Sequence, residues 1–216
     1  MRAFAQLIEA IRAAVSQAEK VDALADYFCR AEPADAAWAL ALLTRRRSTQ
    51  LVKPDRLSLW AAEAAAIPLW LIDECRQVSG DLGETLALIL PPVPSLDATP
   101  CACIGQPGPN PQGACPPAHD ELAVPGIRLH ELVEDRLSPL SRLDPAAQRD
   151  LVLRTWAELD TRERLVWNRL LTGTFRIGVS RAMLARALAR LGGIHVQPLV
   201  GIRPGGQRHA LNALYD

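Results

Sequence analysis

Residues 160–191 read DTRERLVWNRLLTGTFRIGVSRAMLARALARL, and this stretch predicts the class of the fold. It contains two helix patterns in succession. The first opens at Asp160-Thr161-Arg162-Glu163, which has the spacing of a capped helix start, and Gly173 is a typical helix stop. The second is capped by Ser180 and runs over 181–191. The stretch therefore predicts helix followed by helix.

The same periodicity continues through most of the 216 residues. Ala and Leu supply much of the 49% apolar content and only 5% is aromatic, which favours helices over sheets. Residues 3–16 place five apolar side chains on one helix face, namely Phe4, Leu7, Ile8, Ile11 and Val15. Further helices are expected over 21–30, from 34 to 47, from a cap at Ser58 to Ala66, over 68–80, 81–91, 127–140 and 145–159. No strand is predicted, so the fold class is all-α.

A proline-rich loop divides the chain. Ten of the 36 residues from Pro91 to Gly126 are proline and four are glycine, and no apolar period survives there. This composition predicts a disordered or extended loop. We therefore expect one helical domain over 1–191, with helical groups at 1–90 and 127–191 joined by this loop, and a divergent tail over 192–216.

Charge is balanced overall but not along the chain. There are 24 cations and 24 anions, and only Lys20 and Lys53 are lysines. Residues 162–216 hold nine cations against two anions, which gives a net charge of +7. A second basic group contains Arg45, Arg46, Arg47, Lys53 and Arg56. Such clusters are typical of a nucleic-acid surface, and the alternative from charge alone is a solvated helix face that forms salt bridges with acidic helices elsewhere.

The sequence contains no convincing motif for a metal site, for nucleotide binding or for a membrane span. Cys101, Cys103, Cys115 and His119 could supply four zinc ligands, but they lie in the proline-rich loop without the usual knuckle spacing. The run 130–134, HELVE, begins like a zinc-protease motif but lacks its second histidine. No phosphate-cradling glycine motif occurs, and no apolar segment is long enough to span a membrane. We expect no metal site, a monomer, and a cytoplasmic, nucleoid-associated location.

Several stretches resemble one family when they are taken in order. Residues 170–180, LLTGTFRIGVS, followed by Ala187-Leu188-Ala189, are similar to a segment of the N-terminal DNA-binding domain of ATP-dependent DNA ligases of bacterial type. Trp60-Ala61-Ala62-Glu63-Ala64-Ala65 resembles another helix of that domain. The resemblance extends over residues 1–191 apart from 98–120. It implies an all-helical domain that grips nicked duplex DNA in repair, recombination and replication.

The catalytic part of such ligases is not recognisable in this sequence. Their reaction uses ATP and Mg²⁺ and begins on the lysine of a K-x-D-G motif. Lys20 is followed by Val-Asp-Ala and Lys53 by Pro-Asp-Arg, so neither fits the motif. We therefore expect no catalytic residue and no cofactor in this chain. We expect a truncated ligase whose tail after Gly193 is a possible frame-shift product.

The turn before the last helix is the sharpest site prediction. Gly173 and Gly178 bracket a segment that leads to a capped helix N-terminus, and backbone N–H groups at such a terminus suit a DNA phosphate. The residues expected to contact DNA are Arg45, Arg46, Arg47, Lys53, Thr172, Gly173, Arg176, Gly178, Ser180, Arg181 and Arg186. An ordinary interhelical turn, with Phe175, Ile177 and Val179 buried, is compatible with this role. The alternatives are a stand-alone nick-binding or duplex-binding protein and a helical protein-interaction scaffold.

Overall fold

The computed structural model describes residues 1–44, 49–91 and 126–191, and these residues contain helices but no strand. The α-helices are α1 (Arg2–Ala13), α2 (Gln17–Arg30), α3 (Pro33–Thr44), α4 (Pro54–Ala65), α5 (Leu69–Ser79), α6 (Leu82–Ile89), α7 (Leu129–Glu131), α8 (Pro145–Glu158), α9 (Thr161–Thr172) and α10 (Arg181–Arg190). A π-helical segment η1 (Leu132–Leu137) and a 3₁₀ segment η2 (Pro139–Arg142) separate α7 from α8. The all-α prediction is confirmed. Most of the proline-rich loop and all of the tail lie outside the described residues.

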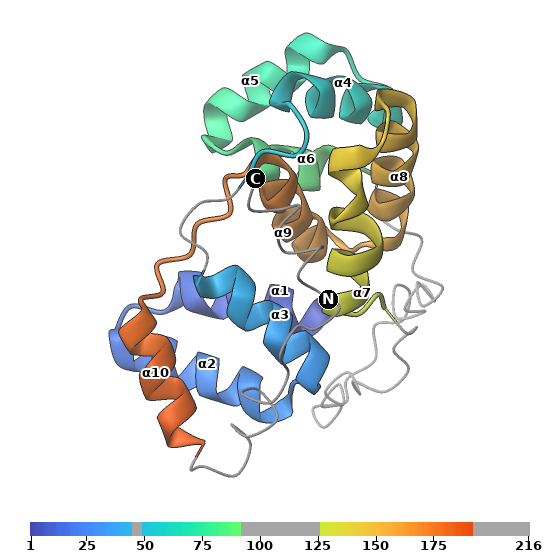
Figure 1. The fold of residues 1–216 in the computed structure, drawn as a ribbon. Helices are drawn as coiled ribbons and strands as arrows, with labels where there is room; N and C mark the ends of the chain where they lie inside the picture. The colour runs from blue at the N-terminus through green and yellow to red at the C-terminus, as the bar shows by residue number, and fades with distance from the viewer. Residues whose placement is uncertain (45–48, 92–125, 192–216) are drawn as a thin grey trace, which may run out of the picture.

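Helix α9 connects two layers of the fold. Figure 1 shows α1, α2, α3 and α10 in one layer and α4, α5, α6 and α8 in the other. α9 packs on α6 of one layer and on α1 of the other, and its Trp167 and Leu171 are fully buried. The apolar face of α9 therefore supplies core to both layers.

The spatial grouping of the helices does not follow the chain. α10 packs on α2 and α9 packs on α6, so each layer combines segments from before and after the proline-rich loop. The groups 1–90 and 127–191 are therefore segments of the chain, and neither corresponds to one layer of the fold. Periodicity indicates which face of a helix is buried, but it does not indicate which helix will cover that face.

Two helix starts differ from the sequence-based expectation. α2 begins at Gln17 rather than at 21, because Ser16 and Glu19 form a capping box in which Ser16 Oγ accepts from the N–H of Glu19 at 3.2 Å. α4 begins at Pro54, whose fixed φ suits a first helical turn, so Ser58 is a buried residue inside the helix and not its cap.

Val15 is also placed differently from the prediction. It is 95% exposed and lies beyond the end of α1, not on the core face of a helix over 3–16. The cause is the next helix start, since the Glu19 carboxylate accepts a hydrogen bond from the N–H of Val15 at 2.9 Å. The turn that caps α2 therefore ends the preceding helical pattern.

The expected single helix over 127–140 is broken into α7, η1 and η2. Pro139 has no N–H, so a regular helix cannot continue through it without losing a hydrogen bond. The N–H of Ser138 instead donates to Val133 O at 2.9 Å, which is the longer π-type connection. The helical pattern over 127–140 is confirmed, but it does not predict the π-helical and 3₁₀ geometry.

Candidate nucleic-acid interface

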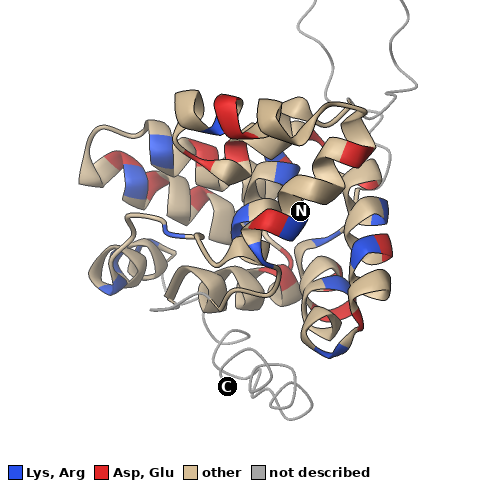
Figure 2. Ribbon diagram, turned by 90° about the horizontal axis from the view of Figure 1, so that it is seen from above, with Lys and Arg blue, Asp and Glu red and all other residues tan. Residues whose placement is uncertain are grey.

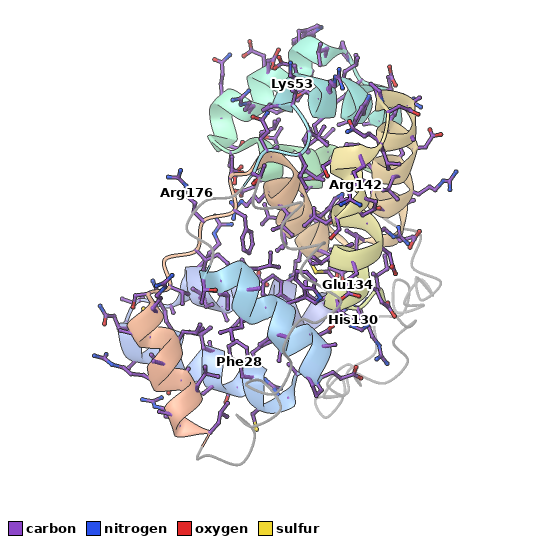
Figure 3. All side chains as sticks on the ribbon, viewed as in Figure 1. Phe28, Lys53, His130, Glu134, Arg142 and Arg176 are labelled. Atoms are coloured by element: carbon purple, nitrogen blue, oxygen red, sulfur yellow. The ribbon has the colours of Figure 1, made fainter. Side chains whose placement is uncertain are left out.

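An extended segment, residues 173–180, joins α9 to α10 along one side of the molecule, and we call it the strap (Figure 1). Its side chains alternate. Phe175, Ile177 and Val179 pack against the core, and the Phe175 ring lies 6.1 Å from that of Phe4, centroid to centroid. Arg176 and Gly178 face outward between them, and Figure 3 shows Arg176 pointing away from the body of the molecule. The strap is thus fixed by one face and exposed on the other.

The strap begins at a turn whose residues are used internally. Gly173 has a φ of 72° and ends α9, and its N–H donates to Arg169 O. Thr172 is buried, and its hydroxyl donates to Asn168 O at 2.9 Å and lies 2.9 Å from the hydroxyl of Thr174. These two residues therefore shape the turn, and neither presents a free polar group to a ligand through its side chain.

The strap ends at the N-terminus of α10. Ser180 is the N-cap, and its Oγ accepts from the N–H of Met183 at 3.2 Å. The first intrahelical bond is made by the N–H of Leu184, so the N–H groups of Arg181 and its neighbour are left for solvent or a ligand. The sequence-predicted cap at Ser180 is confirmed, and it places Arg181 in the first turn of the helix.

The seven arginines of residues 162–190 fall into two sets. Four are held within the protein: Arg162 pairs with Glu9, Arg164 donates to backbone carbonyls, Arg169 pairs with Asp81, and Arg190 pairs with Asp22. Three are exposed and have no carboxylate within 4 Å in the described part of the chain: Arg176, Arg181 and Arg186. The net charge of residues 162–216 therefore overstates the number of cations that are available to a ligand. Figure 2 shows basic and acidic positions close together on many helices, as this internal pairing requires.

The sequence matches the model of a known protein family. The model of the family described as DNA ligase N terminus matches residues 1–189, which includes every described helix except the last residue of α10. The chain belongs to the DNA ligase N-terminal family. No curated protein matches this ligase domain at a significant level.

The described part of the second basic region, Lys53 and Arg56, follows a segment that is bonded to the end of α9, where the strap begins. The N–H groups of Leu51 and Val52 donate to Leu171 O at 2.9 and 3.1 Å, which ties this segment to the end of α9. Lys53 is exposed and lines a shallow hollow of about 480 Å³ together with Arg56 and Gln148. Arg45, Arg46 and Arg47 lie outside the described residues. Lys53 and the strap are far apart in the sequence, and the structure brings both to the end of α9.

One cation near the strap was missed in the sequence analysis. Lys20, on α2, has its ammonium 4.0 Å from the position that a Cβ on Gly178 would occupy. Nothing local in the sequence indicates this proximity, because it arises from the packing of α10 and the strap beside α2.

The zinc-protease-like run in this ligase domain has hydrogen-bonding roles. His130 Nδ1 lies 2.6 Å from Asp35 Oδ1, and Glu134 Oε1 accepts from Trp38 Nε1 at 2.7 Å, so both residues connect to α3 (Figure 3). Among the described residues no cluster of three or more potential metal ligands occurs. Cys101, Cys103, Cys115 and His119 lie outside those residues. No helix in the described ranges is both long and apolar enough to cross a membrane.

Proposed function

We propose that this ligase domain binds nicked duplex DNA through the phosphate backbone, with the strap and the start of α10 as the main contact. The observation that carries the proposal is Arg176. Its neighbours Phe175 and Ile177 pack on the core, so the guanidinium is held out on a fixed segment, and no described carboxylate lies within 4 Å of it. A fixed arginine with no internal partner suits a phosphate oxygen.

The other predicted contacts lie beyond the two ends of the strap. Arg181 and Arg186 continue from the strap along α10, and Lys53 lies next to the end of α9 where the strap begins. Arginine and lysine contacts to phosphate position a protein without reading bases. We therefore propose binding that depends weakly on sequence and strongly on salt. A role as one part of ATP-dependent ligation in repair, recombination and replication, in the nucleoid, follows from the same proposal.

Fluorescence anisotropy with nicked duplex, intact duplex and single-stranded DNA of equal length tests the proposal. If four to six phosphates are neutralised, the slope of log K against log salt is about −4 to −5. Nicked duplex is expected to bind more tightly than single strands. A flat salt dependence, or equal binding to duplex and single strands, contradicts the proposal and favours the interaction scaffold.

We further propose that this chain binds as a monomer and holds no catalytic lysine of its own. Lys20 and Lys53 lack the K-x-D-G context, so ATP and Mg²⁺ would serve the ligation reaction elsewhere. Incubation with labelled ATP and Mg²⁺ is expected to give no lysyl-AMP band on a denaturing gel. A stoichiometric adduct on either lysine would show that the chain is itself a nucleotidyltransferase.

A further inference from the structure

Gly178 is a glycine that the fold itself does not require. Its φ is not among the positive values, which in the described glycines occur at Gly80 and Gly173. The N–H of Val179 donates to Ile177 O at 2.7 Å across Gly178, a tight turn that other residues adopt when φ is negative. A Cβ added at Gly178 would meet a single neighbour within 4 Å, the Lys20 ammonium at 4.0 Å. Neither backbone strain nor crowding inside the molecule therefore explains the glycine.

Lys20 reaches the strap from a different helix. It lies on α2, which packs against α10, and its side chain is partly buried. The absence of a side chain on Gly178 leaves open space next to the Lys20 ammonium. A side chain at Gly178 would extend into that space.

The carboxylates nearest to Lys20 in the sequence are already engaged. Glu19 Oε2 accepts from the N–H groups of Val15 and Ser16 as part of the capping box, and Asp22 pairs with Arg190 of α10. No carboxylate lies within 4 Å of the Lys20 ammonium in the residues that the structure describes. A lysine whose side chain packs partly against the protein, and whose ammonium has no carboxylate beside it, favours binding of an anion.

We propose that Lys20 and the exposed backbone of Gly178 form a phosphate-binding notch, in which one DNA phosphate is held between the Lys20 ammonium and the strap. This inference rests on the proposed function and adds a residue of α2 to the interface. The ligand is a phosphodiester of the duplex backbone. Gly178 lies between Arg176 and Arg181 along the chain, so a phosphate held at the notch would join these two contacts into one track.

Charge-neutral variants test the notch. Lys20→Gln is expected to weaken binding to nicked duplex by about tenfold and to reduce the magnitude of the salt slope by about one. Arg30→Gln is the matched control, because Arg30 is an exposed cation at the other end of α2 and bonds to its own helix at Asp26 O. Gly178→Ala is expected to weaken binding by at least threefold with an unchanged melting temperature. In the double variant Lys20→Gln/Gly178→Ala, the loss of binding free energy is expected to be smaller than the sum of the losses in the two single variants, because both substitutions act on one phosphate.

The scarcity of lysine gives an independent measurement. Lys20 and Lys53 are the two lysines of the sequence, so lysine-directed acetylation read by mass spectrometry reports on each of them without overlap. Nicked duplex is expected to protect Lys20 in the wild-type protein and to protect it less in Gly178→Ala.

The outcomes separate this inference from the proposed function. If Arg176→Ala weakens binding while Lys20→Gln behaves like Arg30→Gln, the notch is wrong and the interface stands without α2. Equal acetylation of Lys20 with and without DNA also overturns the notch. If the wild-type protein shows no salt-dependent binding to duplex, both the proposed function and the notch are wrong.

Discussion

Arg176 is the side chain on which the proposed interface depends most, and its environment allows a clean test. It is exposed and makes no hydrogen bond or ion pair with a described residue, so Arg176→Ala removes a charge without removing packing. We expect nicked-DNA binding to weaken by about 1–2 kcal/mol and the salt slope to fall by about one, with little change in melting temperature. Arg154→Ala, an exposed charge change on α8, is the control. If melting falls while the affinity of the folded fraction is unchanged, Arg176 is structural.

The two glycines of the strap, Gly173 and Gly178, have different roles. Gly173 has a φ of 72°, a conformation in which a side chain is strained, whereas the backbone at Gly178 imposes no such demand. We expect Gly173→Ala to lower the free energy of unfolding by about 1 kcal/mol and Gly178→Ala to leave it unchanged. Urea denaturation of both variants measures this difference. Equal destabilisation by the two substitutions would contradict the assignment.

Helices α3 and α7 are joined through Asp35, and this element contact depends on pH. Burial raises the pKa of Asp35, but hydrogen bonds from the backbone and ring of His130 and from the N–H of Leu129 outweigh burial, so the pKa lies below its ordinary value. The nearby N-terminal ammonium acts in the same direction. A lowered pKa means that Asp35 contributes stability above its unfolded value, about 3.9, and that this contribution is lost as the pH falls through the folded value.

Asp35→Asn therefore tests the contact between these elements. At pH 7 we expect the variant to lose about 1–2 kcal/mol of unfolding free energy, because the substitution removes a charged acceptor. The difference from the wild type is expected to shrink as the pH falls below about 4, where the unfolded chain binds the proton, and to disappear below the lowered pKa of Asp35 in the folded protein. Thermal melts from pH 3 to 7 measure this, with the exposed Asp73→Asn as control. A difference that is constant over this range would show that the carboxylate charge is unimportant.

Over the whole molecule, Arg164 holds together segments that the proline-rich loop separates. Its guanidinium is buried and donates to Trp156 O at 2.8 Å, to Leu90 O at 3.3 Å and to Pro91 O at 2.7 Å. The ends of α6 and α8 are thus fixed to α9. Arg164→Met leaves these carbonyls without a donor, and we expect a loss of about 3 kcal/mol in urea denaturation. Arg154→Met serves as the exposed control. A loss of unfolding free energy below about 1 kcal/mol in Arg164→Met would contradict the structural role of Arg164.

The helical class and much of the strap follow from the amino-acid sequence alone. Local signals are sufficient for these features, since a cap at Ser180, a stop at Gly173 and the alternation of Phe175, Ile177 and Val179 each depend on residues a few positions apart. The same reasoning failed where local signals compete, as at Ser58 within α4 and at the π-helical turn before Pro139.

Which cations are exposed to a ligand depends on how the helices pack, and the sequence does not reveal it. Arg164, Arg169 and Arg176 are equal members of one basic stretch in the sequence, but packing buries the first, pairs the second with Asp81 and leaves the third exposed. Lys20 lies beside the strap because α2 packs against α10. The physical reason is that the sequence gives the charge of each residue, whereas the burial of a side chain and its ion-pair partner depend on which helix faces pack against one another. That choice is made by the amphipathic faces of the whole chain together.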